Sequence, residues 1–240
     1  MKNLIILIIV VLGVCVPVIA QDEIKMETHF DFYSQYVWRG QSVVDEPVFQ
    51  PSISALYKNL TFSAWGNLET TKVNDKEWKF TEADFTIDYS NYFSKEMPKI
   101  GYSFGLINYD FPNTDFDNTT ELYAGINIEM FLNPYIKIFR DIDEVDGTYV
   151  SVGISETLWL GLEGAAILGW GDRGYNDSYW GSNNSKANDL VLSISRPIEY
   201  KGMKLVPSLS YIRLMDKDLG SIGNDGNDTV VLGFSLVKKF

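Results

Sequence analysis

The side chains of this 240-residue chain that could do chemistry are one histidine, one cysteine and 32 carboxylates. His29 and Asp31 are two residues apart, a spacing that puts both side chains on one face of a strand. A serine hydrolase needs a serine, a histidine and a carboxylate or amide within reach of one another. A lone histidine beside an aspartate is more typical of a structural hydrogen bond. The sequence also has no G-x-S-x-G motif and no phosphate-binding loop. We therefore predict no catalytic residue and no enzymatic activity.

Metal and cofactor chemistry has equally little support. Cys15 is the only cysteine, so neither a disulfide framework nor a cysteine-based zinc site can form within the chain. Two acidic clusters leave open a divalent cation at an outer loop, although neither has the spacing of an EF-hand. Solvated acidic loops facing lipopolysaccharide are the simpler interpretation. We predict no cofactor and no metal site. The clusters are Asp141, Asp143, Asp146 and Gly147, and Asp216, Asp218, Asp225 and Asp228.

Composition excludes several classes of protein. The chain has 20 basic and 32 acidic side chains, a net charge of −12, whereas nucleic-acid binding needs a basic surface. The mean hydropathy of −0.07 is too low for a membrane protein of several helices. The 14 Tyr, 14 Phe and 6 Trp residues argue against disorder. The composition therefore indicates a single folded domain. The high aromatic content of so acidic a chain still needs an explanation.

Residues 1–20 have the pattern of a secretory signal peptide. Lys2 is followed by an apolar run, compact residues end at Ala20, and Gln21 begins an abruptly polar segment. The alternatives are an N-terminal membrane anchor and a lipoprotein signal that uses Cys15. The run is short for a membrane span, and Val14 is bulky for a lipoprotein signal. We therefore expect Sec-type export of a mature chain that starts at residue 21.

After residue 21 the dominant pattern is period-2 alternation of apolar and polar residues, which predicts β-strands. About twelve segments show it, of which 135–140 is short and ambiguous. Ten or fourteen strands remain compatible with the pattern. The segments are 26–38, 49–57, 60–67, 82–89, 100–106, 121–128, 135–140, 149–155, 158–168, 189–195, 204–211 and 230–236.

The polar face of these strands carries mainly Ser, Thr, Gly, Asn, Asp and Glu, with few of the Lys and Arg residues that usually coat a solvated surface. Small polar side chains suit the crowded interior of a closed barrel, so the apolar face would meet lipid. We predict an all-β fold, a transmembrane antiparallel up-and-down β-barrel of about 12 strands over residues 21–240. The alternative is a soluble barrel or sandwich with its apolar face inside.

Loop lengths and aromatic positions favour the membrane barrel. Long predicted connections at 39–47, 68–77, 110–118, 141–147, 171–188 and 215–228 alternate with shorter ones, as in outer-membrane barrels. Several aromatic residues fall near strand ends, where the two interfacial girdles would lie. They are Tyr36, Trp38, Tyr89, Tyr109, Tyr135, Trp159 and Trp170.

The end of the chain resembles the signal that the outer-membrane assembly machinery reads. Phe234, Leu236 and the terminal Phe240 are apolar at alternate positions, although Lys238 departs from the usual apolar residue. We therefore expect that machinery as a partner, together with outer-membrane lipid and lipopolysaccharide.

Three short motifs resemble the TorF family of porin-like outer-membrane proteins. They are Tyr36-Val37-Trp38-Arg39-Gly40-Gln41-Ser42 with Pro47 after it, Ala64-Trp65-Gly66-Asn67, and Glu121-Leu122-Tyr123-Ala124-Gly125-Ile126. The third departs at Ile126, where the family has an aromatic residue. The resemblance covers about residues 26–130 and implies a Gram-negative outer-membrane location and a barrel fold rather than a particular substrate.

The polar face defines the expected lumen. We predict that its charged groups are Asp31, Glu82, Asp84, Asp88, Glu121, Glu163, Asp189, Lys137 and Lys204, with Arg39 near the outer mouth. Arg39 would either pair with a wall carboxylate or bind an anionic solute. An acidic lumen favours passive diffusion of small cations or neutral polar solutes. The alternative is a non-conducting barrel that serves as a binding or structural envelope protein, closed for instance by Tyr33, Tyr123, Tyr135 and Tyr149.

Overall fold

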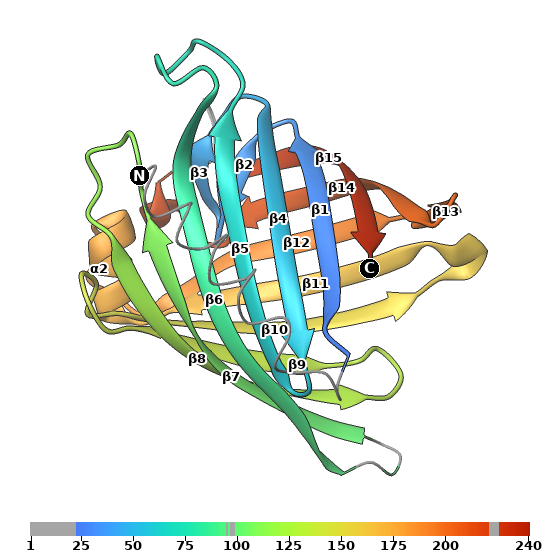
Figure 1. Ribbon diagram of the computed structural model, residues 1–240. Helices are drawn as coiled ribbons and strands as arrows, with labels where there is room; N and C mark the ends of the chain where they lie inside the picture. The colour runs from blue at the N-terminus through green and yellow to red at the C-terminus, as the bar shows by residue number, and fades with distance from the viewer. Residues whose placement is uncertain (1–22, 95, 97–98, 221–225) are drawn as a thin grey trace.

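The computed structural model describes residues 23–94, 96, 99–220 and 226–240, and the sequence folds there into a closed barrel (Figure 1). The predicted signal peptide at 1–20 and Asp225 lie outside the described residues. Neighbouring strands are antiparallel and follow one another in the chain. The ring closes because β1 pairs with both β4 and β15, and β12 pairs with β14. This confirms the prediction of an all-β, up-and-down barrel of 12 strands.

The twelve wall strands coincide with the twelve alternating segments. They are β1 (Lys25–Tyr33), β4 (Val48–Tyr57), β5 (Leu60–Glu69), β6 (Lys79–Ser94), β7 (Lys99–Asp110), β8 (Thr119–Glu129), β9 (Tyr135–Asp141), β10 (Thr148–Thr157), β11 (Glu163–Gly171), β12 (Lys186–Ser195), β14 (Met203–Leu214) and β15 (Asp228–Lys239). The ambiguous segment 135–140 is therefore a wall strand.

Shorter elements occupy the connections. They are β2 (Tyr36–Trp38), β3 (Gln41–Val44), the 3-10 turn η1 (Trp159–Gly161), the helix α2 (Arg173–Trp180), β13 (Ile198–Tyr200) and the 3-10 turn η2 (Lys217–Leu219). None of the described helices is long and apolar enough to cross a membrane.

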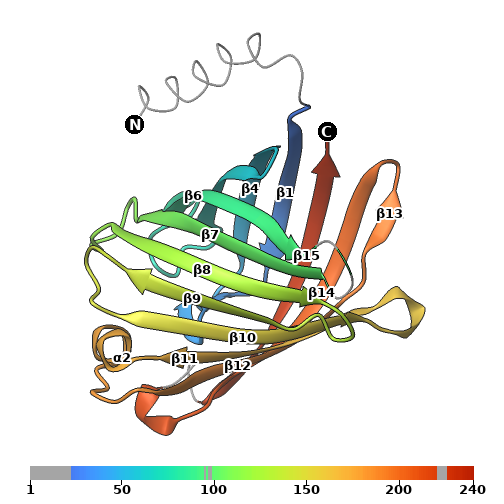
Figure 2. The same ribbon diagram turned by 90° about the horizontal axis from the view of Figure 1, so that it is seen from below.

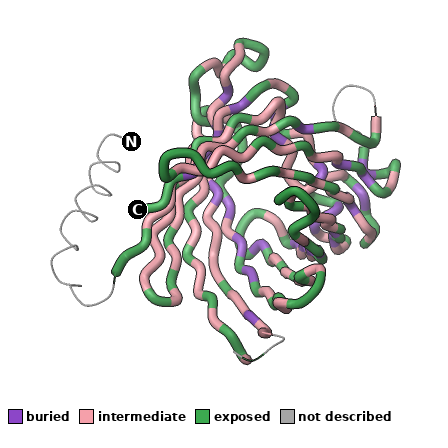
Figure 3. The backbone as a smooth tube through the Cα atoms, turned by 90° about the vertical axis from the view of Figure 1, so that its right-hand side faces the viewer, coloured by how far each residue is buried: buried purple, intermediate pink, exposed green. Residues whose placement is uncertain are grey.

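The apolar side chains of the wall point outward. Phe104 and Leu232 are 53% and 60% exposed, whereas Glu82, Glu121 and Asp189 are buried inside the ring. Exposed and less exposed positions alternate along the strands (Figure 3). A closed ring satisfies the backbone hydrogen bonds of every wall strand, so such a surface can face lipid. The apolar belt contradicts the soluble alternative, in which these side chains would form the core.

The two ends of the barrel differ as predicted. One end carries the long connections 34–47, 70–78, 111–118, 142–147, 172–185 and 215–227. The other end carries the shorter turns and both ends of the described chain, where Phe240 and Met26 exchange backbone hydrogen bonds. Figure 2 shows the ring of strands with α2 at the rim.

Two predicted strands end differently in the structure. The segment 26–38 breaks after Tyr33, where the Ser34 hydroxyl accepts the Leu232 N–H in place of a backbone carbonyl. Tyr36 and Trp38 therefore leave the wall, while Tyr109 and Tyr135 point into the barrel, so the assignment of these four residues to an interfacial girdle was wrong. The segment 158–168 begins as a strand only at Glu163, after the turn η1 in which Leu160 has a positive φ.

Candidate functional site in the barrel lumen

A hairpin folds into the lumen from the connection between β1 and β4. Its strands β2 and β3 pair only with each other, as a two-stranded sheet separate from the wall. Arg39 and Gly40 form the turn with φ values of 47° and 82°. Two consecutive positive φ angles are typical of the tight turn that matches the twist of a hairpin. The turn therefore places the Arg39 side chain at the tip of the inserted hairpin.

Arg39 is clamped to the far wall. Its Nη1 and Nη2 atoms each donate a 2.7 Å hydrogen bond to one carboxylate oxygen of Glu121 on β8. The side chains of this pair are 9% and 3% exposed. The hydroxyl of Tyr109 donates a third hydrogen bond to Glu121, at 2.8 Å. Of the two roles that the sequence left open for Arg39, the structure shows the ion pair with a wall carboxylate.

Aromatic rings enclose the guanidinium of Arg39. Its central carbon lies 4.4 Å from the ring centres of Trp38, Phe139 and Tyr149, and 5.9 Å from that of Tyr175. Such stacking stabilises a cation that is removed from water. The bidentate carboxylate and the rings together leave the guanidinium no face open to a passing solute.

The backbone of the turn fits against a third part of the wall. A Cβ atom on Gly40 would lie 2.9 Å from the side chains of both Asp189 on β12 and Leu214 on β14. Asp189 in turn accepts a 2.9 Å hydrogen bond from Tyr149. Since β8 lies five strands from β1 on one side of the ring and β12 lies three strands from it on the other, the hairpin extends across the lumen.

The helix α2 lies at the rim of the long-loop end, beside β10 and β11 (Figures 1 and 2). Trp38 packs edge-on against Tyr179 with ring centres 5.3 Å apart, and Tyr175 is 1% exposed. Asp172 caps the helix by accepting the Tyr175 N–H, and Gly181 ends it in a left-handed conformation. These two residues are the local signals by which the missed helix could have been predicted.

A buried amide network holds α2 on the rim. Asn188 of β12 donates to Asn176 at 2.7 Å and accepts the Gly171 N–H. Asn176 donates to the carbonyls of Gly171 and Asn184. Because buried polar groups are costly without partners, this network specifies one position for the helix.

The inward tyrosines do not close the lumen, in contrast to the sequence-based alternative. Tyr33, Tyr123 and Tyr135 each lie directly opposite a glycine of the neighbouring strand: Gly233, Gly105 and Gly153 respectively. A Cβ on any of these glycines would lie 2.4–2.6 Å from an atom of the facing ring. Tyr149 pairs with Gly171 but lies diagonally over Gly169, where an added Cβ would collide with its hydroxyl. The rings therefore lie flat on the wall, and the hairpin is what narrows the lumen.

The register places the remaining predicted lumen groups on the inward face at different heights. Asp31 pairs with Ser235 and Gln50, Glu163 with Ser195, and Lys204 with the buried Val237. Asp88 accepts the hydroxyl of Tyr123, over whose ring the Lys137 ammonium lies at 3.7 Å. Glu82 and Asp84 lie on β6 beside the hairpin, close to the Tyr36 hydroxyl. These groups line one lumen but do not form one cluster.

A cavity of about 230 Å³ lies between the hairpin and the wall on its near side. It is lined by Tyr33, Gln35, Tyr36, Val37, Gln50, Ser210, Ile212 and Val231. The hairpin therefore leaves space along β1, β4, β14 and β15, whereas its tip closes against the opposite wall.

His29 lies near the short-turn end, away from the hairpin. Its Nε2 atom is 2.7 Å from Glu27 rather than bonded to Asp31, and Glu27 also pairs with Lys239 at 3.0 Å. The arrangement ties β1 to β15. No serine or cysteine nucleophile enters these contacts among the described residues.

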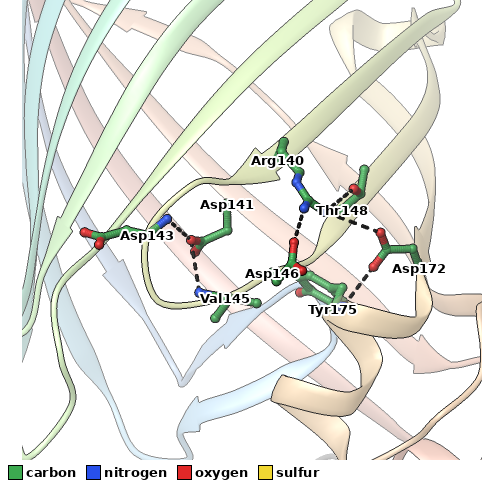
Figure 4. Close-up of polar contacts among 8 residues, drawn as sticks. All are labelled: Arg140, Asp141, Asp143, Val145, Asp146, Thr148, Asp172 and Tyr175. Carbon is green, nitrogen blue, oxygen red and sulfur yellow. Dashed lines mark hydrogen bonds and ion pairs between the residues drawn. The ribbon is translucent and has the colours of Figure 1, made fainter.

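Carboxylates of the first acidic cluster bond to groups of their own loop and its flanking strands (Figure 4). Asp141 accepts the backbone N–H groups of Asp143 and Val145 and the hydroxyl of Thr119. Asp146 pairs with Arg140, which also approaches Asp172 at 3.8 Å. The carboxylates therefore hold their own loop in shape.

The Asp172 carboxylate connects this loop to α2. Partial burial raises its pKa, but hydrogen bonds from Tyr175 and Thr148 and the charge of Arg140 outweigh burial and hold the pKa below its ordinary value. The contribution of this cap to stability is present at neutral pH and is lost as the pH falls through the lowered pKa.

The second acidic cluster contacts a lysine. Lys186 Nζ lies 3.1 Å from Asp216 and 3.5 Å from Asp218, and Asp228 accepts the hydroxyl of Tyr211. Across residues 23–94, 96, 99–220 and 226–240, no group of three or more His, Cys, Asp or Glu side chains has the arrangement of a metal site.

No family model matches the chain, and no curated protein matches it either. Solved barrels do resemble it. OccAB3 of Acinetobacter baumannii is 8% identical with a TM-score of 0.46, over 93% of this chain and 66% of that one. The COG4313 outer membrane channel from Pseudomonas putida F1 is 11% identical with a TM-score of 0.48, over 90% of this chain and 95% of that one. The chain thus spans 66% of the length of OccAB3. Because no family model matches, the resemblance to the TorF family stays a prediction.

Proposed function

We propose that the protein is an outer-membrane channel through which small cations or neutral polar solutes diffuse passively. The observation that carries the proposal is the inverted barrel, with a continuous apolar surface outside and a polar, charged wall inside. Carboxylates outnumber cations on that wall, and the Arg39 charge is neutralised by Glu121. Acidic linings favour cations over anions.

The reconstituted full chain is expected to conduct in planar bilayers, with a reversal potential in a salt gradient that reports cation preference. Asp31 and Glu163 are inward carboxylates of the wall that have no ion-pair partner among the described residues. Replacing Asp31 by Asn and Glu163 by Gln is expected to lower the cation-to-anion permeability ratio by at least about twofold.

The matched control is the pair Asp115→Asn and Asp117→Asn in the outer loop 111–118, which removes the same charge away from the wall. At ~0.1 M salt, charges farther than about 10 Å from the path are screened, so the reversal potential is expected to stay unchanged. Absence of any conductance across the bilayer, or a preference for anions, would contradict the proposal.

One observation favours the second candidate, a non-conducting barrel with a binding or structural role in the envelope. The hairpin crosses the lumen and buries its Arg39 tip in the opposite wall. A protein that shows a heat-modifiable band on a gel, and hence a stable barrel, but no conductance would support this candidate.

We also propose that the chain is exported by the Sec route, loses residues 1–20 and is assembled through its last strand. The outward side chains of β15 include Phe234, while Phe240 lies directly after the strand and is 67% exposed. This strand completes the ring by pairing with β1, so its recognition would precede closure. Outer-membrane lipid, including lipopolysaccharide, would cover the apolar face, and we expect no nucleic-acid partner.

The substitution Phe240→Ala is expected to lower the amount of folded barrel in outer-membrane fractions several-fold, because it removes the terminal aromatic group of the proposed signal. The amount is measured from the heat-modifiable band. Lys238→Ala, on the same outward face two residues earlier, is the control and is expected to be neutral. Equal yields from both variants would argue against a role for the terminal residue.

A further inference from the structure

Apart from the apolar packing of Tyr36, Val37 and Val44 on the wall, the inserted hairpin has few attachments. Between residues 36 and 46, no backbone–backbone hydrogen bond joins the hairpin to the described part of the wall. On β3, the Gln41 Nε2 and Ser42 Oγ atoms are buried and have no hydrogen-bond partner among the described residues. The Tyr36 hydroxyl lies near Glu82 at the base, and the hydrogen bonds that attach the hairpin to the wall are those of the charged Arg39 side chain at the tip.

The tip contact is strong and specific. A bidentate guanidinium–carboxylate pair has a fixed planar geometry that lysine cannot reproduce, and here both partners are buried. Removing one partner of a buried pair leaves the other charge uncompensated, which is far more costly than never having had the pair. We call the hairpin seated when its tip is bound to Glu121. The seated position therefore depends on a single side chain at either end of this contact.

The hairpin also determines how much of the lumen is open. Its tip and the helix α2 fill the side near β8 to β12, whereas the cavity of about 230 Å³ lies on the other side, toward β1, β4, β14 and β15. A solute that passes the seated hairpin has only this space. Releasing the tip would join the two sides into one wider passage.

We propose that the Arg39–Glu121 pair sets the size limit of the channel by holding the β2–β3 hairpin across the lumen. Arg39 acts as a positioning residue and not as a contact for solute, because carboxylate and rings occupy it completely. This inference rests on the proposed channel function for its transport consequence, but the seating of the hairpin can be measured without transport.

Seating is tested by the reactivity of a thiol at position 42. Ser42→Cys is introduced into the full chain carrying Cys15→Ser, so that one thiol is present. A membrane-impermeant maleimide is then applied to the folded protein. Adding Arg39→Gln or Glu121→Gln is expected to raise the labelling rate roughly tenfold or more, since either change breaks the buried pair. Arg39→Lys is expected to lie between, because it keeps the charge but loses the bidentate geometry.

Arg140→Gln is the matched control. It removes an arginine and its ion pairs with Asp146 and Asp172 from the outer rim, and Arg140 itself contacts no residue of the described hairpin. Heat-modifiable mobility checks that every variant forms the barrel. A labelling rate that is the same in Arg39→Gln, Glu121→Gln and Arg140→Gln barrels would overturn the inference.

Liposome swelling with sugars of increasing size then tests the size limit. The unmodified protein is expected to admit only the smallest sugars, and the Arg39→Gln and Glu121→Gln proteins are expected to admit larger ones. If labelling rises while no variant admits any solute or ion, the proposed channel function fails and the seating of the hairpin stands. If the wild type conducts and the variants keep its size limit, the channel function stands and this inference fails.

Discussion

The substitution Phe104→Arg is expected to prevent the barrel from assembling. Phe104 points outward from β7, is 53% exposed and stacks on Tyr89 with ring centres 5.1 Å apart. A charged side chain on the lipid face near the middle of the bilayer costs about 2–4 kcal/mol, and the lost ring contact adds about 0.5–1.5 kcal/mol. Loss of the heat-modifiable band after reconstitution, together with a lowered free energy of unfolding in urea, is the measurement.

Ser103→Arg is the matched control for this prediction. Ser103 precedes Phe104 on the same strand but lies on the inward face, opposite Gly125 of β8 and Ser90 of β6. An arginine there would extend into a lumen that is rich in carboxylates, so the barrel is expected to assemble. If Ser103→Arg abolished assembly and Phe104→Arg did not, the assignment of the two faces would be reversed.

The second large effect is expected at Gly105, the next residue of the same strand. Its added Cβ would lie 2.4 Å from the carbonyl oxygen of Ile87 and 2.6 Å from the ring of Tyr123. The carbonyl belongs to the wall and cannot move away, and displacing the ring would break the hydrogen bond from Tyr123 to Asp88. Overpacking of about 1–3 kcal/mol and a lost charged hydrogen bond of about 1.5–3 kcal/mol predict that Gly105→Ala lowers the free energy of unfolding by about 3–5 kcal/mol.

Gly125→Ala tests whether this effect belongs to the tyrosine–glycine contact or to any inward glycine. At Gly125 the nearest atoms to an added Cβ are 3.2–3.3 Å away and include the mobile side chains of Ser103 and Lys137. We expect a loss below about 1.5 kcal/mol in the same urea unfolding experiment. Comparable losses at the two glycines would show that close packing of Tyr123 is not the cause.

Local patterns were sufficient for the wall and its two ends. Each wall strand lies in a segment of period-2 alternation, because the side chains of a strand point to opposite faces whatever its partners are. Small polar residues on one face also indicated which face is inside. Loop lengths then placed the long connections together at one end, since consecutive antiparallel strands alternate direction.

The same local patterns failed where the chain leaves the wall. Tyr36 and Trp38 continue the alternation of β1, so no local signal separates a longer strand from a hairpin that turns inward. The short helix α2 has too few turns for a helical period to show. Its caps, Asp172 and Gly181, are residue types typical of helix ends and could have been recognised in the sequence. For the hairpin the sequence predicted a strand end, and for α2 it predicted a loop. Both segments had about the right extent but the wrong conformation.

The sequence by itself determined the strands, the inverted faces and a set of charged residues on the polar side, because each of these follows from neighbours along the chain. Only the tertiary structure decided what those charges do. Arg39 meets Glu121 across 82 residues, and Tyr123 rests on Gly105 of another strand. Such contacts depend on the register and closure of the whole barrel, which no local pattern encodes. The narrowing of the lumen by an inserted hairpin is therefore a property of the closed ring and not of any segment within it.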